Sequence, residues 1–158
     1  YWIGQALWVS LTACAAIIAI LSPEDDTLPL LAIVGMALWL SGFTIESISD
    51  YQKRAFRKEN NPSEAFIHTG LWARSRHPNY FGEIMLWTGI AVIALNTLTG
   101  IEYITLISPI FVYILLTRMS GINKLEQIAD ERYGNLEEYQ RYKRNTPVLV
   151  PNLLKDKT

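Results

Sequence analysis

The chain has 158 residues, of which 50% are hydrophobic and 18% are charged, and its formal net charge is −1. This composition favours one membrane domain over a soluble globule, and the charge gives no reason to expect nucleic-acid binding. The only cysteine, Cys14, excludes an internal disulfide, and together with two histidines it makes a metal site unexpected. The sequence starts at Tyr1 without an initiator Met or a basic segment, so we expect no signal peptide and a chain taken from a longer protein.

Four apolar stretches predict four transmembrane helices. The first two, residues 2–21 and 28–45, contain no charged residue and approach the ~20 residues that cross the hydrocarbon layer. The third, residues 80–98, contains Glu83 in its first turn, and the fourth, residues 101–117, contains Glu102 near its start. The alternative for the shorter stretches is a buried helix of a soluble protein. We therefore expect an all-α, polytopic membrane helix bundle that forms a single domain over residues 1–158.

All 14 Lys and Arg residues fall into two segments. One is the central loop between residues 49 and 79, and the other is the tail from Arg118 onward, whereas the connections at residues 22–27 and 99–100 contain none. The positive-inside rule places the central loop and the tail in the cytoplasm. The sequence thus predicts an integral, multi-pass protein, of the inner or plasma membrane if it is bacterial. The alternative is that these charges serve membrane insertion only, but that does not explain why they alternate with Trp, His, Asn and Tyr.

Charged residues recur with helical spacing just beyond the second apolar stretch. If the helix continues past the membrane surface, Glu46, Asp50, Lys53 and Arg57 share one face. Lys53 and Arg57 are four residues apart, so both side chains can point at one anion, such as a phosphate. The alternative is an Asp50–Arg54 surface pair with basic side chains that snorkel to the membrane interface.

A polar cluster surrounds Pro78. Proline disfavours helical geometry at the preceding residue, His77, and can itself open the next helix. Arg76, His77, Asn79 and Tyr80 should therefore gather at a helix N-terminus, where free N–H groups and the helix dipole attract anions. The alternative is an interfacial belt, in which Trp72 and Tyr80 anchor the helix.

Glu83 lies one turn into the third apolar stretch. An acidic side chain that faces lipid costs roughly 2–3 kcal/mol or more. Glu83 should therefore face a polar cavity or a partner, and Glu46 is a candidate for lining the same cavity.

The tail predicts two short amphipathic helices. The first carries a regularly spaced apolar face and is closed by Gly134, and the second begins near Leu136 and stops before Thr146-Pro147. The apolar face of the first helix consists of Ile122, Leu125, Ile128 and Ala129. We expect the tail to pack under the bundle; a solvated basic tail is the alternative.

These stretches together resemble the C-terminal membrane domain of the steroid 5α-reductase-like proteins. The resemblance is strongest to a bacterial branch designated as a domain of unknown function, with the sterol C14- and Δ7-reductases as more distant relatives. It covers residues 5–151 approximately. Its strongest parts are Gln52-Lys53 with Phe56-Arg57, residues 75–83, and Glu126 with Arg132-Tyr133-Gly134, Tyr139, Tyr142 and Pro151.

The resemblance implies a cytoplasm-facing NADPH site under the C-terminal helices, and hydride transfer to the conjugated C=C of a lipid-like or steroid-like enone. By position, the phosphate binders would be Lys53 and Arg57. The nicotinamide or ribose end would be lined by Leu71 and Trp72. The nicotinamide ribose and amide would be held by Arg76, His77, Asn79, Tyr80 and Glu83. The adenosine end would be fixed by Glu126, with Lys124 and Arg132 near it. The pocket would be closed by Tyr139 and Tyr142, and the catalytic acid would be Glu83 or Tyr80.

Two other functions remain open. An isoprenylcysteine-type membrane methyltransferase would bind S-adenosylmethionine, which carries no phosphate and would not need the cations at Lys53 and Arg57. A non-catalytic membrane protein would keep the fold as a lipid- or nucleotide-binding module. The sequence indicates neither the lipid substrate, which could be a steroid, a hopanoid precursor, a fatty enoyl chain or a quinone-like ring, nor the oligomeric state.

Overall fold

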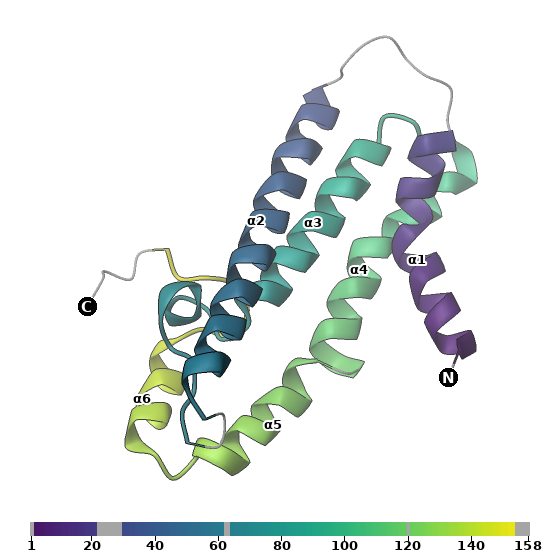
Figure 1. The fold of residues 1–158 in the computed structure, drawn as a ribbon. Helices are drawn as coiled ribbons and strands as arrows, with labels where there is room; N and C mark the ends of the chain where they lie inside the picture. Colours follow the sequence, from purple (N-terminus) through teal and green to yellow (C-terminus); the bar gives the residue numbers. More distant parts are fainter. Residues whose placement is uncertain (1, 22–29, 62–63, 120, 154–158) are drawn as a thin grey trace.

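The computed structural model describes residues 2–21, 30–61, 64–119 and 121–153 (Figure 1). In these ranges the chain forms helices and no strand, which confirms the predicted all-α class. The longer helices are α1 (Trp2–Leu21), α2 (Leu30–Glu59), α3 (Pro78–Ala94), α4 (Ile107–Ile114), α5 (Ile122–Tyr133) and α6 (Glu137–Asn145). The short ones are the 3-10 helices η1 (Gly70–Ala73) and η2 (Gly100–Leu106) and the π-helix η3 (Leu115–Met119).

Two helical stretches in the described ranges are long and apolar enough to cross a membrane, judged by length and composition. They are Leu30–Glu59 and Gly100–Tyr133, which contain the second and fourth predicted spans. The first predicted span coincides with α1, whose apolar part Val9–Leu21 is shorter. The third corresponds to α3, which has 17 residues and is slightly short of the ~20 that a span needs. Membrane crossing by α1 and α3 therefore stays a prediction.

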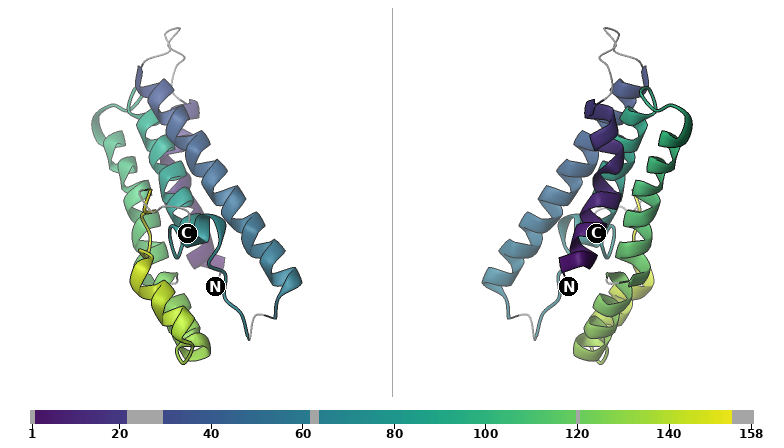
Figure 2. Two further views of the ribbon diagram at one scale, coloured as in Figure 1. Left: turned by 90° about the vertical axis from the view of Figure 1, so that its left-hand side faces the viewer. Right: turned by 90° about the vertical axis from the view of Figure 1, so that its right-hand side faces the viewer.

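The centre of the bundle is α3, which contacts α1, α2 and α4 (Figures 1 and 2). Its contact with α2 is made by backbone, at two pairs of glycines. A Cβ on Gly42 of α2 would lie 2.6 Å from the carbonyl oxygen of Gly82, and one on Gly89 of α3 would lie 2.6 Å from that of Gly35. No side chain fits at these positions, so the two helix axes approach closely.

On the other side of α3, α1 packs against α3 and α4. Ala15 of α1 and Ala94 of α3 are fully buried there, together with Leu98. The buried Ser108 hydroxyl of α4 donates a hydrogen bond to the Thr12 carbonyl of α1 at 2.6 Å. Small residues and a satisfied hydroxyl are the contacts by which helices pack in apolar surroundings.

The charged segments meet at one end of the bundle. The C-terminal half of α2, η1, α5 and α6 all lie there, and Figure 2 shows that α2 and the α5–α6 pair form two sides of this end. Helix α2 continues to Glu59, so Lys53 and Arg57, which are four residues apart on it, lie on the same face of the helix. The predicted tail helices are also confirmed, since α5 ends at Tyr133 and the Gly134 N–H donates to the Asp130 carbonyl at 2.9 Å. The cytoplasmic orientation of this end stays a prediction.

Candidate functional site

The short helix η1 is attached to α2 by side chain-to-backbone hydrogen bonds. Gly70 starts it with φ at +62°, which favours glycine. The Leu71 N–H donates to Gln52 Oε1 at 3.0 Å, and the Trp72 indole N–H donates to the Ser49 carbonyl at 3.1 Å. As a result, the Trp72 ring is 5% exposed and fixed beside the cationic face of α2.

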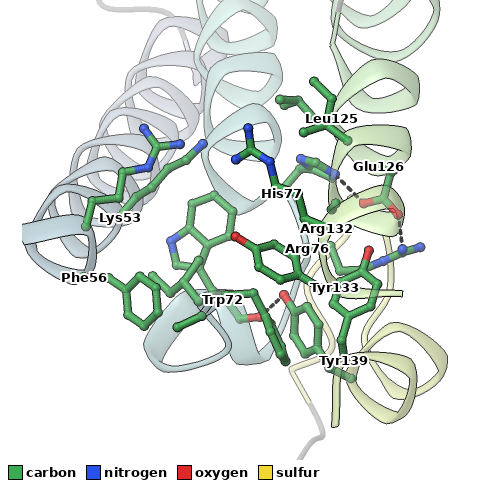
Figure 3. A pocket seen from close by; sticks show the side chains of 17 residues that line it. Lys53, Phe56, Trp72, Arg76, His77, Leu125, Glu126, Arg132, Tyr133 and Tyr139 are labelled. Atoms are coloured by element: carbon green, nitrogen blue, oxygen red, sulfur yellow. Dashed lines mark hydrogen bonds and ion pairs between the residues drawn. The ribbon is translucent and has the colours of Figure 1, made fainter. Parts of the chain in front are cut away.

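A cavity of about 190 Å³ lies between α2, η1 and the two C-terminal helices (Figure 3). Lys53 and Phe56 reach it from α2, and Glu126 and Arg132 reach it from α5. The complete lining is Lys53, Phe56, Arg57, Ala65, Phe66, Ile67, Trp72, Arg76, His77, Leu125, Glu126, Ile128, Ala129, Arg132, Tyr133, Tyr139 and Tyr142.

Three cations of this lining have no anionic partner in the described part of the chain. Lys53, Arg57 and Arg132 form no ion pair with any described residue. The Lys53 ammonium lies 5.1 Å from the centroid of the Trp72 ring, within cation–π range. Burial, and then the like charge of Arg57, lower the pKa of Lys53, and the negative charge of Asp50 offsets them only in part. The cavity therefore holds positive charge that an anionic ligand would neutralise.

Aromatic rings form another wall. The Phe66 ring is at its centre, with ring centroids 5.7 Å from Tyr133, 5.2 Å from Tyr139 and 5.4 Å from Tyr142. The Tyr142 hydroxyl donates to the Trp72 carbonyl at 2.7 Å, which connects α6 to η1. These contacts leave flat apolar surfaces next to the cations, an arrangement that suits a planar ring attached to a phosphate.

A carboxylate joins α5 to the loop before α3. Glu126 accepts a hydrogen bond from the Arg76 guanidinium, and its other oxygen lies 2.8 Å from His77 Nε2. Burial by itself would raise the pKa of Glu126, but the hydrogen bond from His77 and the charge of Arg76 outweigh it, so this pKa lies below its ordinary value. Nearby, Lys143 of α6 pairs with Asp130 of α5 at 2.6 Å.

The N-terminus of α3 has the predicted arrangement. His77 is the N-cap, with φ −136° and ψ 62°, and Pro78 opens the helix. The Tyr80 ring stacks on the His77 ring, with centroids 5.6 Å apart and planes 15° from parallel. Two buried atoms of this region, Arg76 Nε and Asn79 Oδ1, have no hydrogen-bond partner among the described residues.

The structure brings most of the predicted site residues to the one cavity. Those that line it are Lys53, Arg57, Trp72, Arg76, His77, Glu126, Arg132, Tyr139 and Tyr142. Those that do not are Leu71, Asn79, Tyr80, Glu83 and Lys124. Lys124 is exposed on α5, and Tyr80 and Glu83 lie in the first turns of α3, where Gly82 packs against Glu46 of α2. Glu126, assigned from the resemblance to the adenosine end, directly contacts Arg76 and His77, assigned to the nicotinamide end.

Several lining residues are absent from the sequence-based site. With Ala65, Phe66 and Ile67 form a short apolar run in a polar part of the loop, and this run is the sequence signal that could have found them. Leu125, Ile128 and Ala129 belong to the apolar face predicted for the first tail helix, and they form part of the cavity wall.

Comparisons with known proteins agree with the family resemblance that the sequence predicts. The family model described as "Protein of unknown function (DUF1295)" matches residues 1–146. The 3-oxo-5-alpha-steroid 4-dehydrogenase 1 of Mus musculus is 30% identical over 122 residues, which are 77% of this chain and 42% of the mouse protein. The Rattus norvegicus protein of the same name is 28% identical over the same shares of the two chains. The Homo sapiens protein is 38% identical over 60 residues, which are 38% of this chain and 23% of the human one.

The chain thus spans less than half the length of these curated relatives. No solved structure matches it significantly. The chain belongs to the DUF1295 family, and the similarity to the steroid 4-dehydrogenases confirms the predicted resemblance to the steroid 5α-reductase-like proteins.

Proposed function

We propose that the protein is an NADPH-dependent membrane reductase that transfers hydride to the conjugated C=C of a steroid-like or other lipid enone. The names of its relatives denote removal of hydrogen from a 3-oxo-5-alpha-steroid, and the reverse direction is reduction of a C=C conjugated with a ketone. The observation that carries the proposal is the cationic cavity, in which Lys53, Arg57 and Arg132 have no anionic partner among the described residues.

The residues of the cavity fit part of a dinucleotide. Its volume of about 190 Å³ is below the ~300–1,000 Å³ of typical small-molecule sites, so it would take one portion of NADPH rather than the whole molecule. Lys53 and Arg57 would bind phosphate oxygens, and Trp72 and Phe66 would contact a planar ring. A polar ligand group would also satisfy Arg76 Nε, because a buried polar atom without a partner is costly.

Bound NADPH would supply the hydride. The chain itself would supply the proton, from the Tyr80 hydroxyl or the Glu83 carboxyl, to the carbonyl side of the enone. His77 is placed to connect the two functions, because its ring contacts both Glu126 in the cavity and the Tyr80 ring on α3. Neither candidate acid lines the cavity, which would keep the proton source separate from the phosphate binders; the Tyr80 ring stacks on His77 and lies against Gly121.

The aromatic wall would also suit the adenosyl group of S-adenosylmethionine, the cofactor of the methyltransferase alternative. The cations oppose that assignment, since the sulfonium group of this cofactor is itself positively charged and offers no phosphate to Lys53 or Arg57. The uncompensated positive charge of the cavity therefore favours NADPH.

The proposal is tested by the variant Lys53→Ala/Arg57→Ala, with NADPH and NADH titrated against protein in nanodiscs. Loss of two charge-assisted contacts should weaken NADPH by about a hundredfold. A much smaller loss for NADH would assign the pair to the 2′-phosphate, and an equal loss would assign it to the pyrophosphate. The matched control is Arg54→Ala/Lys58→Ala, which removes the same charge from exposed positions of the same helix outside the cavity. Unchanged NADPH affinity in the first variant would contradict the proposal.

A further inference from the structure

After α6 the chain turns back and runs along the loop that precedes α3. The Arg76 N–H donates to the Pro147 carbonyl at 2.9 Å, and the His77 N–H donates to the Val148 carbonyl at 3.1 Å. These two backbone donors lie just outside the helix and have no intrahelical acceptor, so the C-terminal segment supplies the partners that buried N–H groups require.

Side chains of the same loop extend this contact. The hydroxyl of Ser75, which is fully buried, donates to the Leu149 carbonyl at 2.7 Å. Farther along, the Asn152 N–H donates to the Arg74 carbonyl at 2.9 Å, and the Arg74 guanidinium donates to the carbonyls of Asn152 at 3.2 Å and Leu153 at 3.1 Å. Hydrogen bonds thus join residues 147–153 to each residue from Arg74 to His77.

The side chains of this loop reach the cavity although the C-terminal segment does not. Arg76 and His77 hold the Glu126 carboxylate, and Glu126 belongs to α5, which forms one wall. The C-terminal segment is therefore linked to the cavity wall indirectly. It is hydrogen-bonded to the loop, and the Arg76 and His77 side chains of that loop contact Glu126 of α5. A change in residues 147–153 would move the loop first and Glu126 second.

We propose that residues 147–153 act as a positioning strap, which holds the Arg76–His77–Glu126 network in the geometry that the cavity ligand needs. The match to the family model covers residues 1–146 and thus ends just before the strap. The proposal rests on the proposed function only for the identity of the ligand, since the hydrogen bonds and the network exist without it.

The test compares two shortened forms of the protein in nanodiscs. One ends after Thr146 and lacks the strap; the control ends after Leu153 and keeps it, while both lose Lys155 and Lys157. Without the strap, amide hydrogen exchange at Arg76 and His77 should accelerate at least about tenfold, and NADPH affinity should fall at least about tenfold, as expected for loss of several hydrogen bonds. The thermal transition of the bundle should match that of the control.

Two point variants keep the test informative if the shortened form fails to fold. Arg74→Ala removes only the guanidinium contacts to the strap. Ser75→Ala removes the hydroxyl that donates to the Leu149 and Val148 carbonyls and accepts from the His77 N–H. Neither residue belongs to the cavity lining. Arg74→Ala is the sharper of the two, because the hydrogen bonds of the Arg74 side chain go only to Asn152 and Leu153, whereas Ser75 contacts His77 directly. Arg74→Ala should shift the imidazole ¹⁵N resonances of His77 and leave those of the exposed His68 unchanged.

The strap proposal would be overturned if the exchange rates, the His77 resonances and the NADPH affinity all matched those of the control. If no form binds NADPH while the form without the strap shows faster exchange and shifted His77 resonances, the proposed function fails and the strap stands.

Discussion

The α2–α3 pair and the charged end of the bundle are held together by different kinds of contact. Between α2 and α3 the backbones touch at Gly42 with Gly82 and at Gly35 with Gly89, and the outward face of α2 is exposed, with Leu40 51% accessible. At the charged end, helices are joined by long side chains, such as the Glu126 carboxylate between Arg76 and His77.

The difference shows which changes each region tolerates. On the exposed face of α2, one apolar residue can replace another. At the glycine positions that face α3 no side chain is tolerated, because backbone cannot move aside as a flexible side chain can. The charged end depends on particular polar groups, and its contacts respond to charge and pH. The proposed function belongs to the charged end, and the α2–α3 contact determines where the residues of the charged end lie.

The largest expected effect is at the helix contact. Gly42→Val would place side-chain atoms against the backbone of α3, where a Cβ alone would lie 2.5 Å from the Leu86 nitrogen. Overpacking against backbone should lower the free energy of unfolding by about 3 kcal/mol or more, measured in detergent. Leu40→Val, on the exposed face of the same helix, should cost less than about 0.5 kcal/mol. Equal effects at the two positions would show that the glycine contact does not hold α3.

Local signals predicted much of this architecture from sequence. His77-Pro78 indicated the start of α3, Gly134 the end of α5, and the spacing of Lys53 and Arg57 their common direction. Each of these depends on residues a few positions apart, where proline geometry, glycine and the helical repeat determine the outcome.

The remaining features depend on contacts between distant segments. Glu126 and Arg76 are separated by 50 residues, and Ser75 and Leu149 by 74, so nothing local specifies either pair. The end of regular structure near Pro147 was predicted, yet the hydrogen bonds that the segment then makes to the loop were not. The aromatic wall around Phe66 is likewise a product of packing between the loop, α5 and α6.

A smaller effect is expected where a single carboxylate joins two segments. Glu126→Gln would leave the Arg76 charge, whose side chain is 12% exposed, without its anionic partner, at a cost of about 2 kcal/mol in local stability. Hydrogen exchange of α5 measures this. The control, Glu137→Gln, breaks an exposed pair with Arg141 and should cost about 0.5 kcal/mol or less. An α5 that exchanges no faster than in the control would remove Glu126 from the network.

The same contact predicts an acid transition at the charged end. The pKa of Glu126 is lower in the folded protein than its ordinary 4.5, so the stability it contributes is present above about pH 4.5 and is lost as the pH falls through the folded pKa. Asp130 acts in the same direction, since its hydrogen bond from Lys143 lowers its pKa. Exchange in α5 and α6 should therefore accelerate at acid pH before exchange around the Gly35–Gly89 contact, since residues 30–45 and 84–94 contain no ionisable side chain. Simultaneous loosening of both regions would contradict the comparison.

The smallest effect concerns the charge of Lys53. Its pKa is lowered, and a bound phosphate would raise it again, so NADPH affinity should fall a few-fold as the pH rises toward the lowered pKa. Lys53→Arg should flatten this alkaline dependence, because arginine stays protonated. If the arginine variant keeps the slope, another group is responsible for it.

The central claim is that the cavity at the charged end binds NADPH. Its most direct test is titration of the protein in nanodiscs with NADPH and, in parallel, with S-adenosylmethionine, followed by quenching of tryptophan fluorescence, to which Trp72 in the cavity wall should contribute. We expect saturable quenching by NADPH and none by S-adenosylmethionine. Saturation by S-adenosylmethionine alone, or by neither cofactor, would contradict the claim.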